Sequence, residues 1–295
     1  MTRAGYIALL GRPNVGKSTL LNHLIDYKLS ITSPRPQTTR HALLGIQTLE
    51  TAQLVYVDTP GLQQNARNAL NRHMNRAATH ALSYVDIVVL VLDALQFNTE
   101  DQAVIKQLQR FTGTVIAAVN KIDRLSDKTR LLPYLSELQN HYPFAASIPI
   151  SALQRDNLAA LQQTLIEHLP AAPFLFAADE LTTASSRFLA AELIREKLFR
   201  RLHEELPYAL TVEIEHFQEE AQLLRIAAKI WVERQGQKGI VIGAGGHQLR
   251  DIGRAARLDM QTLFGKKVFL SLWVKVRSDW SDDERSLQQF GYHDA

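Results

Sequence analysis

The sequence contains no cysteine, so disulfide bonds, thiolate metal clusters and nucleophilic or redox chemistry at sulfur are excluded. It also lacks an apolar run of the roughly 20 residues that a membrane-spanning helix needs. The longest apolar runs cover only residues 87–92 and 171–178. The first apolar segment leads directly into a glycine-containing turn, which is typical of a first strand rather than a signal peptide. We therefore expect a protein of the reducing cytoplasm.

The composition excludes disordered and fibrous classes, because 46% hydrophobic and 21% charged residues is the balance of a globular protein. The net charge is only +3, but it is unevenly distributed. Residues 225–277 hold 11 basic and 3 acidic side chains, whereas the flanking segments 171–224 and 278–295 are both acidic. This distribution predicts a polyanionic partner for the basic segment.

Up to about residue 168, short apolar runs alternate with helical patterns, which is typical of a parallel sheet covered by helices on both faces. The sequence thus predicts an α/β, doubly wound fold for this part. The expected strands cover residues 6–10, 54–57, 87–92, 115–119 and 147–150, and the expected helices cover 16–26, 67–82, 99–110, 128–141 and 157–168.

The composition changes after residue 168, where Pro170, Pro173 and several polar residues follow the last expected helix. We expect a first domain over residues 1–170, a linker over 171–185, and a second domain with a C-terminal tail over 186–295. The second domain is expected to be α+β, with a helix (187–203), two strands (208–217 and 223–233), a glycine-punctuated helical pair (237–264) and a last strand (268–276).

A phosphate-binding loop is predicted between the first strand and the first helix. The segment Gly11-Arg12-Pro13-Asn14-Val15-Gly16-Lys17-Ser18 matches G-x-x-x-x-G-K-[ST] in the strand-to-helix context that this motif requires. Its glycines let successive backbone N–H groups surround phosphates. Lys17 can neutralise the β- and γ-phosphate charges, and Ser18 offers a hydroxyl to Mg²⁺.

A second motif, Asp58-Thr59-Pro60-Gly61, follows the apolar strand at 54–57. Its position predicts that Asp58 holds Mg²⁺ through water and that Gly61 presents its backbone N–H to the γ-phosphate. The pattern D-x-x-G is common by itself and often marks only a turn. Its significance here comes from the phosphate-binding loop that precedes it.

A third motif, Asn120-Lys121-Ile122-Asp123, follows the strand at 115–119 and predicts recognition of guanine. The Asp123 carboxylate can accept from N1–H and the 2-amino group of guanine together, and adenine offers neither donor. Asn120 can bond the other edge of the base, Lys121 can lie along the ring, and Ser151-Ala152-Leu153 fits the remaining loop around the base. The alternative is a polar side chain that only caps the following turn.

The polar segment Thr32-Ser33-Pro34-Arg35-Pro36-Gln37-Thr38-Thr39-Arg40, called the switch loop below, lies between the first two motifs. One of its threonines must complete the Mg²⁺ shell when the γ-phosphate is present, and we expect Thr39 rather than Thr38. We expect the γ-phosphate to order this loop and the loop after Asp58, and hydrolysis to release both.

These motifs make residues 5–168 resemble the translation-factor-related GTPases. The position after D-x-x-G, where Ras-type GTPases carry a water-orienting glutamine, is Leu62. Slow intrinsic hydrolysis is therefore expected unless a partner or a cation supplies the missing group. In related GTPases an asparagine at the position of Asn14 coordinates K⁺, so the resemblance implies K⁺ as a second cation. A hydrogen bond within the loop is the alternative role for Asn14.

The basic segment contains a G-x-x-G sequence, Gly243-Ala244-Gly245-Gly246, after an apolar run at 240–242. This segment and the order of elements around it resemble a type II KH domain, in which the loop and two helices clamp the backbone of four nucleotides. Ala244-Gly245 replaces the usual basic residue, so phosphate contacts are expected from backbone N–H groups, His247 and flanking cations. The alternative is a solvated basic surface. The residues expected to bind RNA are Lys238, Ile240, Ile242, Gly243, Ala244, Gly245, Gly246, His247, Arg250 and Arg254.

Nearly the whole chain resembles the KH-domain-containing GTPases of the translation-factor-related class. Segments that carry the resemblance include 37–41, 194–197, 206–208 and 273–276. The resemblance implies GTP-dependent binding to the 3′ end of 16S ribosomal RNA, a role in assembly of the small (30S) ribosomal subunit, and peripheral contact with the cytoplasmic face of the inner membrane. We expect a monomer that binds GTP and GDP with Mg²⁺ and hydrolyses GTP slowly.

Lys17, Thr39 and Gly61 are expected to act in hydrolysis, and Ser18, Thr39 and Asp58 to hold Mg²⁺. Two other functions stay open: an RNA-binding module whose GTPase domain is only a platform, and a membrane-bound GTPase with incidental basic charge. The expected nucleotide-binding residues are Gly11, Asn14, Val15, Gly16, Lys17, Ser18, Thr19, Asp58, Thr59, Pro60, Gly61, Asn120, Lys121, Asp123, Ser151, Ala152 and Leu153.

Overall fold

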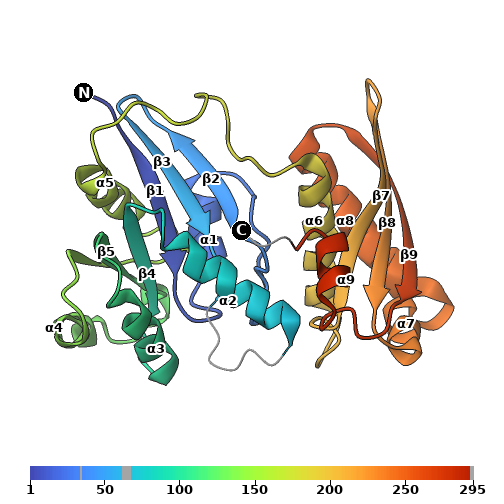
Figure 1. Cartoon of the computed structure of the whole chain (residues 1–295), viewed down its shortest axis with the longest axis horizontal. Coiled ribbons are helices and arrows are strands. Elements are labelled where there is room, and N and C mark those ends of the chain that lie inside the picture. The colour runs from blue at the N-terminus through green and yellow to red at the C-terminus, as the bar shows by residue number, and fades with distance from the viewer. Residues whose placement is uncertain (34, 62–67, 293–295) are drawn as a thin grey trace.

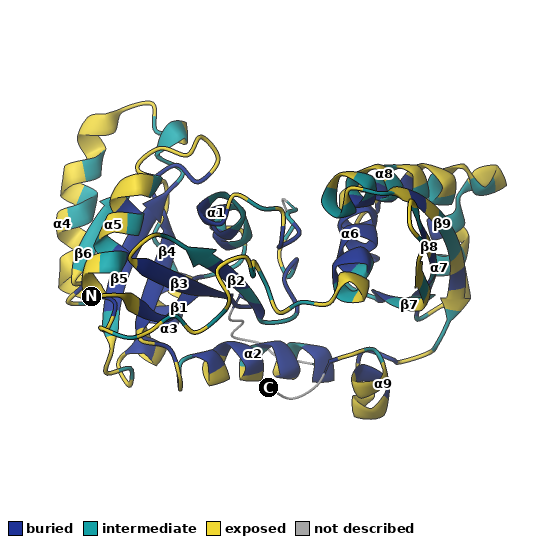
Figure 2. Ribbon diagram, turned by 90° about the horizontal axis from the view of Figure 1, so that it is seen from above, coloured by how far each residue is buried: buried dark blue, intermediate teal, exposed yellow. Residues whose placement is uncertain are grey.

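The computed structural model describes residues 1–33, 35–61 and 68–292. Two units, each built around its own sheet, lie side by side (Figure 1). The first, called the G unit, ends with the helix α5 (Leu158–His168), and the second, called the KH unit, begins with the helix α6 (Ser186–Arg201). In both views α6 lies between the G unit and the sheet of the KH unit (Figures 1 and 2).

The G unit contains a six-stranded sheet in the order β2-β3-β1-β4-β5-β6. Neighbouring strands are parallel except for β2, which runs antiparallel to β3. The strands cover Arg3–Leu10 (β1), Leu43–Thr48 (β2), Ala52–Asp58 (β3), Ile87–Asp93 (β4), Thr114–Asn120 (β5) and Ala146–Pro149 (β6).

Helices cover both faces of this sheet, which confirms the predicted doubly wound α/β fold. Strands β3 and β4 are buried along their whole length, because the side chains of both faces pack under helices. Leu20 and Leu161 belong to the apolar cluster on one face, and Ala78, Val104 and Leu138 belong to the cluster on the other. The helices are α1 (Lys17–Leu24) with α5 on the first face, and α2 (Ala69–Ala81), α3 (Thr99–Leu108) and α4 (Leu131–His141) on the second.

Two details differ from the sequence-based expectation. The edge strand β2 was not expected, because its mixed sequence around Gly45 lacks the continuous apolar run of a strand buried on both faces. A Cβ at Gly45 would lie 2.8 Å from Leu21 Cδ1, so glycine is what allows α1 to pack closely here. The single helix expected over 128–141 is instead a 3₁₀ turn (Lys128–Arg130) followed by α4. Pro133 lies in the first turn of α4, where its missing N–H is tolerated.

The KH unit contains a three-stranded sheet in the order β7-β8-β9, with β7 antiparallel and β9 parallel to β8. Its helix, strand, strand, helix, helix, strand order confirms the predicted type II KH topology. Helices α6 and α8 contribute to the apolar core on one face of the sheet. After α6 the elements are β7 (Leu210–Glu219), β8 (Leu223–Val232), α7 (Gln235–Ile242), α8 (His247–Phe264), β9 (Lys267–Val276) and α9 (Glu284–Gln289).

The segment between the units is bound to the edge of the G-unit sheet. The Gln53 side chain accepts from the backbone N–H groups of Leu175 (2.7 Å) and Phe176 (2.9 Å), and donates to the Phe176 carbonyl (2.9 Å). Further along, the Thr182 hydroxyl donates to the Leu44 carbonyl (2.7 Å). The expected linker therefore follows the surface of the G unit before α6 begins.

The C-terminal segment returns to the G unit. Trp280, Leu287 and Tyr292 form a buried cluster with Leu70 and Met74 of α2. The helix α9 (Figure 2) lies within this segment and was not expected. The acidic sequence of this segment contains no long apolar pattern and therefore gave no signal of this packing.

In the part of the chain that the structure describes, none of the helices combines the length and apolar character required to cross a membrane.

Candidate functional site

Four of the predicted site segments meet at one edge of the G-unit sheet. They follow β1, β3, β5 and β6, and these four strands all run in the same direction. The carboxyl ends of parallel strands lie at the same edge, where α/β proteins bind ligands. The topology therefore places the phosphate-binding loop, the Asp58 loop, the Asn120 loop and the Ser151 loop together.

The phosphate-binding loop between β1 and α1 needs its two glycines for space and for backbone conformation. Gly11 and Gly16 have φ values of 145° and 104°, which side chains other than glycine rarely adopt. A Cβ would lie 2.4 Å from the Val91 carbonyl oxygen at Gly11 and 2.4 Å from Asn120 Nδ2 at Gly16. Between them, Asn14 also has a positive φ of 63°. The loop thus packs its backbone directly against the two neighbouring strand ends.

The Lys17 ammonium lies inside this loop and is only 7% exposed. It donates to the carbonyl oxygens of Gly11 (2.8 Å) and Arg12 (3.0 Å). Burial lowers the pKa of Lys17 to about 8, although the nearby Asp58 carboxylate opposes that shift. The charge is therefore poorly solvated by the protein, and phosphate oxygens are suitable partners for its N–H groups.

Hydroxyl groups converge on the Asp58 carboxylate at the end of β3. Ser18 Oγ donates to Asp58 Oδ2 at 2.9 Å, and Thr39 Oγ1 lies 3.5 Å from the same oxygen. Ser18 Oγ and Thr39 Oγ1 are themselves 2.8 Å apart. Asp58 Oδ1 is buried and has no hydrogen-bond partner among the described residues. One carboxylate with an unpartnered oxygen and two adjacent hydroxyls form the hard oxygen set that suits Mg²⁺.

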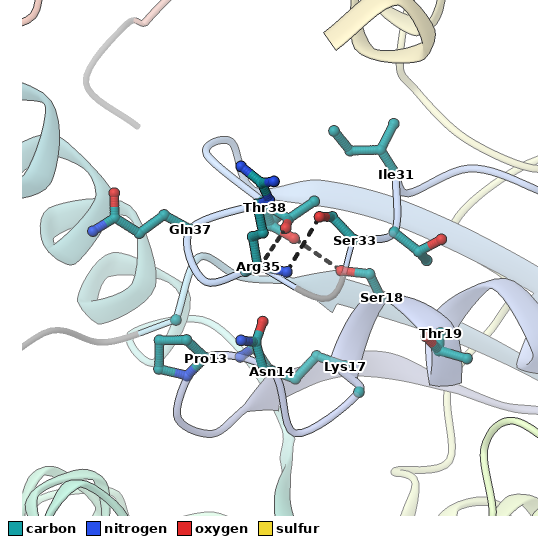
Figure 3. A pocket seen from close by; sticks show the side chains of 14 residues that line it. Pro13, Asn14, Lys17, Ser18, Thr19, Ile31, Ser33, Arg35, Gln37 and Thr38 are labelled. Carbon is teal, nitrogen blue, oxygen red and sulfur yellow. Dashed lines mark hydrogen bonds between the residues drawn. The ribbon is translucent and has the colours of Figure 1, made fainter. Parts of the chain in front are cut away.

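Thr38 points elsewhere, because its hydroxyl donates to the Arg35 carbonyl at 2.8 Å. The geometry thus favours Thr39 as the threonine of the candidate Mg²⁺ site. A cavity of about 70 Å³ lies between the switch loop and the phosphate-binding loop. The side chains of Lys17 and Asn14 line it from below (Figure 3), and Gly61 contributes backbone.

Ser30 was missed by the sequence analysis, although its hydroxyl donates to Asp58 Oδ2 at 2.6 Å. The Asn22 side chain of α1 holds Ser30 in place by accepting from its N–H (2.8 Å) and donating to its carbonyl (2.7 Å). Burial raises the pKa of Asp58, and the hydrogen bond from Ser30 counteracts that shift. The sequence around Ser30 matches no motif, so only the fold reveals this contact.

No group of three or more His, Asp or Glu side chains is placed to bind a metal ion within residues 1–33, 35–61 and 68–292. The candidate Mg²⁺ site rests on one carboxylate and two hydroxyls instead. Thr59 and Pro60 are buried directly after Asp58, with the Thr59 hydroxyl bound to the Leu9 carbonyl at 2.9 Å. Leu62, for which we predict the absence of a water-orienting group, lies outside the described residues.

The Asn120 side chain connects three loops through hydrogen bonds, in addition to its predicted contact with the base. Its Nδ2 donates to the Val15 carbonyl at 2.7 Å, while Oδ1 accepts from the backbone N–H groups of Lys121 and Ala152, both at 2.8 Å. The side chain is buried. The motif predicts that Asn120 bonds an edge of the base, and it carries no signal of this connection. One Nδ2 hydrogen is not used by these bonds.

The side chains around the expected base position are held by polar contacts. Ser151 Oγ donates to Asp123 Oδ1 at 2.5 Å. Lys121 Nζ donates to Asp93 Oδ2 at 2.8 Å, so in this structure the lysine is bound at the end of β4. Leu153 is 72% exposed at the tip of its loop. Thr19 lines the cavity above the phosphate-binding loop.

The G-x-x-G loop lies between α7 and α8 in the KH unit. Gly243, Gly245 and Gly246 all have positive φ values, of 73°, 57° and 76°, a conformation that favours glycine. Ala244 and Gly245 are exposed. The loop is therefore suited to close approach by a phosphate backbone.

Two cavities flank this loop. One of about 420 Å³ is bordered by Gly246, Arg250 and Arg254 on α8 and by apolar side chains of β9. The other, of about 610 Å³, is bordered by Ile240 and His247. The structure thus divides the expected RNA-binding residues between two sides of the loop.

Five of the expected RNA-binding residues line neither cavity: Gly243, Ala244 and Gly245 of the loop, and Lys238 and Ile242 of α7. Lys238 lies on α7, where its backbone N–H donates to the Arg234 carbonyl at 3.3 Å. Ile242 is half-buried and packs against the apolar core of the KH unit. Arg257, which the sequence places next to the motif, lines the 420 Å³ cavity together with Arg250 and Arg254.

Two family models match the chain: 50S ribosome-binding GTPase over residues 6–121, and KH domain over residues 205–281. The GTPase Era of Pseudomonas fluorescens (strain Pf0-1) is 53% identical over 293 residues, which is 99% of this chain and 98% of that protein. The GTPase Era of Pseudomonas putida (strain W619) is 54% identical over the same share.

Solved structures resemble the whole chain as well. The crystal structure of Aquifex aeolicus Era bound to GDP·AlF₄⁻ has a TM-score of 0.94 and 35% sequence identity, and the match covers 99% of both chains. A crystal structure of Era in complex with MgGDPNP and nucleotides 1506–1542 of 16S ribosomal RNA gives the same TM-score, identity and coverage.

Proposed function

The chain belongs to the Era family of GTPases, and from this premise we propose that it is an RNA-binding GTPase switch. It binds GTP and GDP with Mg²⁺, hydrolyses GTP slowly, and binds 16S ribosomal RNA near its 3′ end during assembly of the 30S subunit. The observation that carries this proposal is the convergence of Ser18, Thr39 and Asp58 above the phosphate-binding loop. A loop that reaches the Mg²⁺ site can report whether the γ-phosphate is present.

In the G unit, Lys17 neutralises the β- and γ-phosphates, and the backbone N–H of Gly61 donates to the γ-phosphate. Ser18, Thr39 and Asp58 would hold Mg²⁺, which would supply charge stabilisation for the transferred phosphoryl group. Both cavity-facing groups, Lys17 and Gly61, line the same space as the switch loop. Leu62 cannot orient the attacking water, so intrinsic hydrolysis is slow.

The base is selected by Asp123, whose carboxylate pairs with two donors of guanine. Ser151 holds one of its oxygens, and Asn120 fixes the loop beside it. This polar site disfavours adenine, because a base without those donors leaves the carboxylate unpaired.

The cation requirement includes K⁺ as well as Mg²⁺. Asn14 lines the cavity above the phosphate-binding loop, where an amide oxygen can face a monovalent cation beside the phosphates. Asn14 would hold such a cation, which would supply positive charge next to the transferred phosphoryl group, as an arginine does in other GTPases.

The KH unit binds single-stranded RNA at its G-x-x-G loop. The backbone N–H groups of the loop and the cations Arg250 and Arg254 contact phosphates, while apolar side chains of β9 contact bases. The basic segment 225–277 carries 11 basic and 3 acidic residues, which favours a polyanion at this surface. The proposal includes the domain limits that the sequence predicts: a first domain over 1–170, a linker over 171–185 and a second domain over 186–295.

Three further parts of the proposal do not depend on the geometry of the site: location in the cytoplasm, action as a monomer, and peripheral contact with the cytoplasmic face of the inner membrane. Sedimentation analysis at micromolar concentration tests the oligomeric state. Co-flotation with vesicles of anionic phospholipid tests the membrane contact.

The proposal is tested by GTP turnover of the full chain in K⁺ and in Na⁺ buffer, with and without an RNA that ends in the 16S 3′ sequence. We expect faster turnover in K⁺, further stimulation by this RNA, and none by its reverse sequence. Lys17→Ala is the matched inactive control. Binding of GTP and RNA without any turnover would support instead the KH module on a structural platform.

A further inference from the structure

The side chain of Arg40, the residue after Thr39, extends from the G unit into the KH unit. The Arg40 side chain is 1% exposed. Its Nη1 donates to the Leu210 carbonyl at 2.8 Å, and its Nη2 donates to the carbonyls of Pro207 and Tyr208, both at 3.1 Å. Two of these carbonyls belong to the turn before β7, and the third belongs to the first residue of β7. The guanidinium of Arg40 thus lies in a polar cage, formed by these carbonyls of the KH unit.

Aromatic rings complete the cage. The guanidinium lies 5.6 Å from the ring centre of Phe199 on α6 and 6.0 Å from that of Trp280, within the range of cation–π attraction. The Tyr292 hydroxyl accepts from Arg40 Nη1 at 3.4 Å. The oxygen atoms that accept from Arg40 in the described part of the chain are all uncharged. The contact therefore needs several elements of the KH unit in place at once, because no single carboxylate offsets the desolvation of the charge.

A second arginine holds the backbone two positions earlier. Arg195 of α6 donates from Nη2 to the Thr38 carbonyl. Its guanidinium is fixed by Glu192, with Nε at 2.7 Å and Nη2 at 2.5 Å from the carboxylate oxygens. It also lies 5.1 Å from the ring centre of Phe199. Both sides of Thr39 are thus attached to the KH unit.

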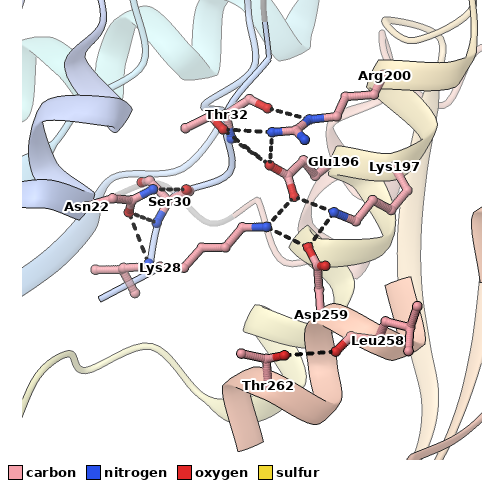
Figure 4. A network of polar contacts seen from close by, with 11 residues as sticks. Asn22, Lys28, Ser30, Thr32, Glu196, Lys197, Arg200, Leu258, Asp259 and Thr262 are labelled. Atoms are coloured by element: carbon pink, nitrogen blue, oxygen red, sulfur yellow. Dashed lines mark hydrogen bonds and ion pairs between the residues drawn. The ribbon is translucent and has the colours of Figure 1, made fainter. Parts of the chain in front are cut away.

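The beginning of the switch loop is attached as well (Figure 4). Glu196 Oε1 accepts from the Thr32 backbone N–H at 3.2 Å and from its hydroxyl at 3.3 Å, and Arg200 Nε donates to the Thr32 carbonyl at 3.2 Å. Lys28 Nζ bridges Glu196 at 2.8 Å and Asp259 of α8 at 2.6 Å. The helix that follows the G-x-x-G loop is therefore connected through ion pairs to the start of the switch loop.

We propose that Arg40 is a positioning residue through which the docked KH unit holds Thr39 at Ser18 and Asp58. Consecutive Cα atoms are only 3.8 Å apart, so a fixed Arg40 leaves Thr39 little freedom. The docked KH unit thus orders the switch loop before the nucleotide binds. Less conformational entropy is then lost when the loop contacts Mg²⁺ and the γ-phosphate. This inference rests on the proposed function, because it concerns how the same nucleotide site is completed.

The test compares three variants of the full chain. Arg40→Met keeps the length of the side chain and removes its donors, and Arg40→Lys restores a cation with a different geometry. Arg187→Met is the matched control: this exposed arginine of α6 also donates to β7 carbonyls, at 2.9 Å (Ile214) and 3.2 Å (Glu215). The measurements are the affinities for GDP and for the non-hydrolysable analogue GppNHp, each over a Mg²⁺ titration.

We expect Arg40→Met to weaken GppNHp binding about tenfold and to raise the Mg²⁺ concentration needed for it. GDP binding should stay within about twofold of the unmodified chain, since GDP has no γ-phosphate to order the loop. Hydrogen exchange of the amides at 38–41 should become faster in the GppNHp complex. Arg40→Lys should recover part of the loss, and Arg187→Met should behave as the unmodified chain.

Equal loss of GDP and GppNHp affinity, or an unchanged GppNHp affinity and exchange rate, would overturn the inference. Circular dichroism checks folding; if Arg40→Met does not fold, Tyr292→Phe removes one acceptor and should shift the same ratio in the same direction. An unmodified chain that binds no GTP would instead refute the proposed function. An unmodified chain that hydrolyses GTP while its Arg40 variants keep the same affinity ratio would refute only this inference.

Discussion

Replacing Asn120 with alanine should weaken binding of GTP and GDP by the same large factor. The side chain makes three hydrogen bonds, to the Val15 carbonyl, the Lys121 N–H and the Ala152 N–H, at 2.7, 2.8 and 2.8 Å. It is 2% exposed, so water cannot replace these bonds without movement of the loops. The phosphate-binding loop and the base-reading loops would then lose their mutual support.

The magnitude follows from the groups left without partners. The Val15 carbonyl and the Ala152 N–H are buried with the side chain, and each buried unpaired polar group costs about 1–3 kcal/mol. The sum is about 2–6 kcal/mol. This free energy appears either as a loss of folding stability or as a rearrangement of the loops, which nucleotide binding must then reverse. A loss of about 30-fold or more in nucleotide affinity is expected, since 1.4 kcal/mol corresponds to a tenfold change.

Isothermal calorimetry with GDP and with GppNHp measures this effect, and RNA binding serves as an internal check on the KH unit. Asn68→Ala is the control, because that side chain caps α2 through one bond to the Asn71 N–H at 2.9 Å and should cost about 1 kcal/mol of stability without a change in affinity. A loss below threefold, or a loss confined to one of the two nucleotides, would show that Asn120 does not connect the loops energetically.

Three further predictions concern the base, the phosphates and the RNA. Asp123→Asn should shift preference from guanosine to xanthosine nucleotides by about 100-fold or more, because the amide replaces an acceptor with a donor; competition between GTP and XTP measures it, and retained GTP preference would contradict the base-reading role. Since the pKa of Lys17 is about 8, its charge is lost as the pH rises and phosphate binding restores it. GTP affinity should thus fall about fourfold from pH 7 to pH 8.5, with proton uptake visible by calorimetry in two buffers; a flat profile would contradict the lowered pKa of Lys17. Gly246→Asp should weaken RNA binding about tenfold by like-charge repulsion. Nothing lies within 4 Å of a Cβ there, but the φ of 76° strains a residue with a side chain, so circular dichroism checks that the variant is folded; unchanged RNA binding in a gel-shift assay would place the RNA site elsewhere.

Much of the candidate site could be predicted because its chemistry is local in sequence. Lys17 and Ser18 are adjacent, and the turn that places them depends on glycines at fixed spacing. The expected strands at 54–57 and 115–119 correspond to β3 and β5, since continuous apolar runs bounded by polar residues are a strong signal of buried parallel strands. Asp58 and Asn120 then fall at strand ends without any knowledge of the tertiary structure.

Other features carry no local signal. Ser30 contacts Asp58 at 2.6 Å from 28 residues away, in a segment that matches no motif. The strand β2 is short and of mixed sequence, and the helix α9 is short and mostly polar. The intrinsic propensity of such a segment is weaker than the effect of its tertiary context. The choice between Thr38 and Thr39 likewise depended on which hydroxyl the folded loop turns toward Ser18.

The sequence by itself determined the two fold classes, the order of the units, and the residue types that we predict to contact phosphate, guanine and RNA, because these depend on periodicity and on short motifs. Only the tertiary structure decided that the switch loop is attached to the KH unit. Arg40 and Leu210 are 170 residues apart. An arginine in a polar loop is by itself expected to be a solvated charge. Its burial follows from the simultaneous docking of α6, the turn before β7 and the C-terminal segment, a cooperative arrangement of long-range contacts that no local pattern encodes.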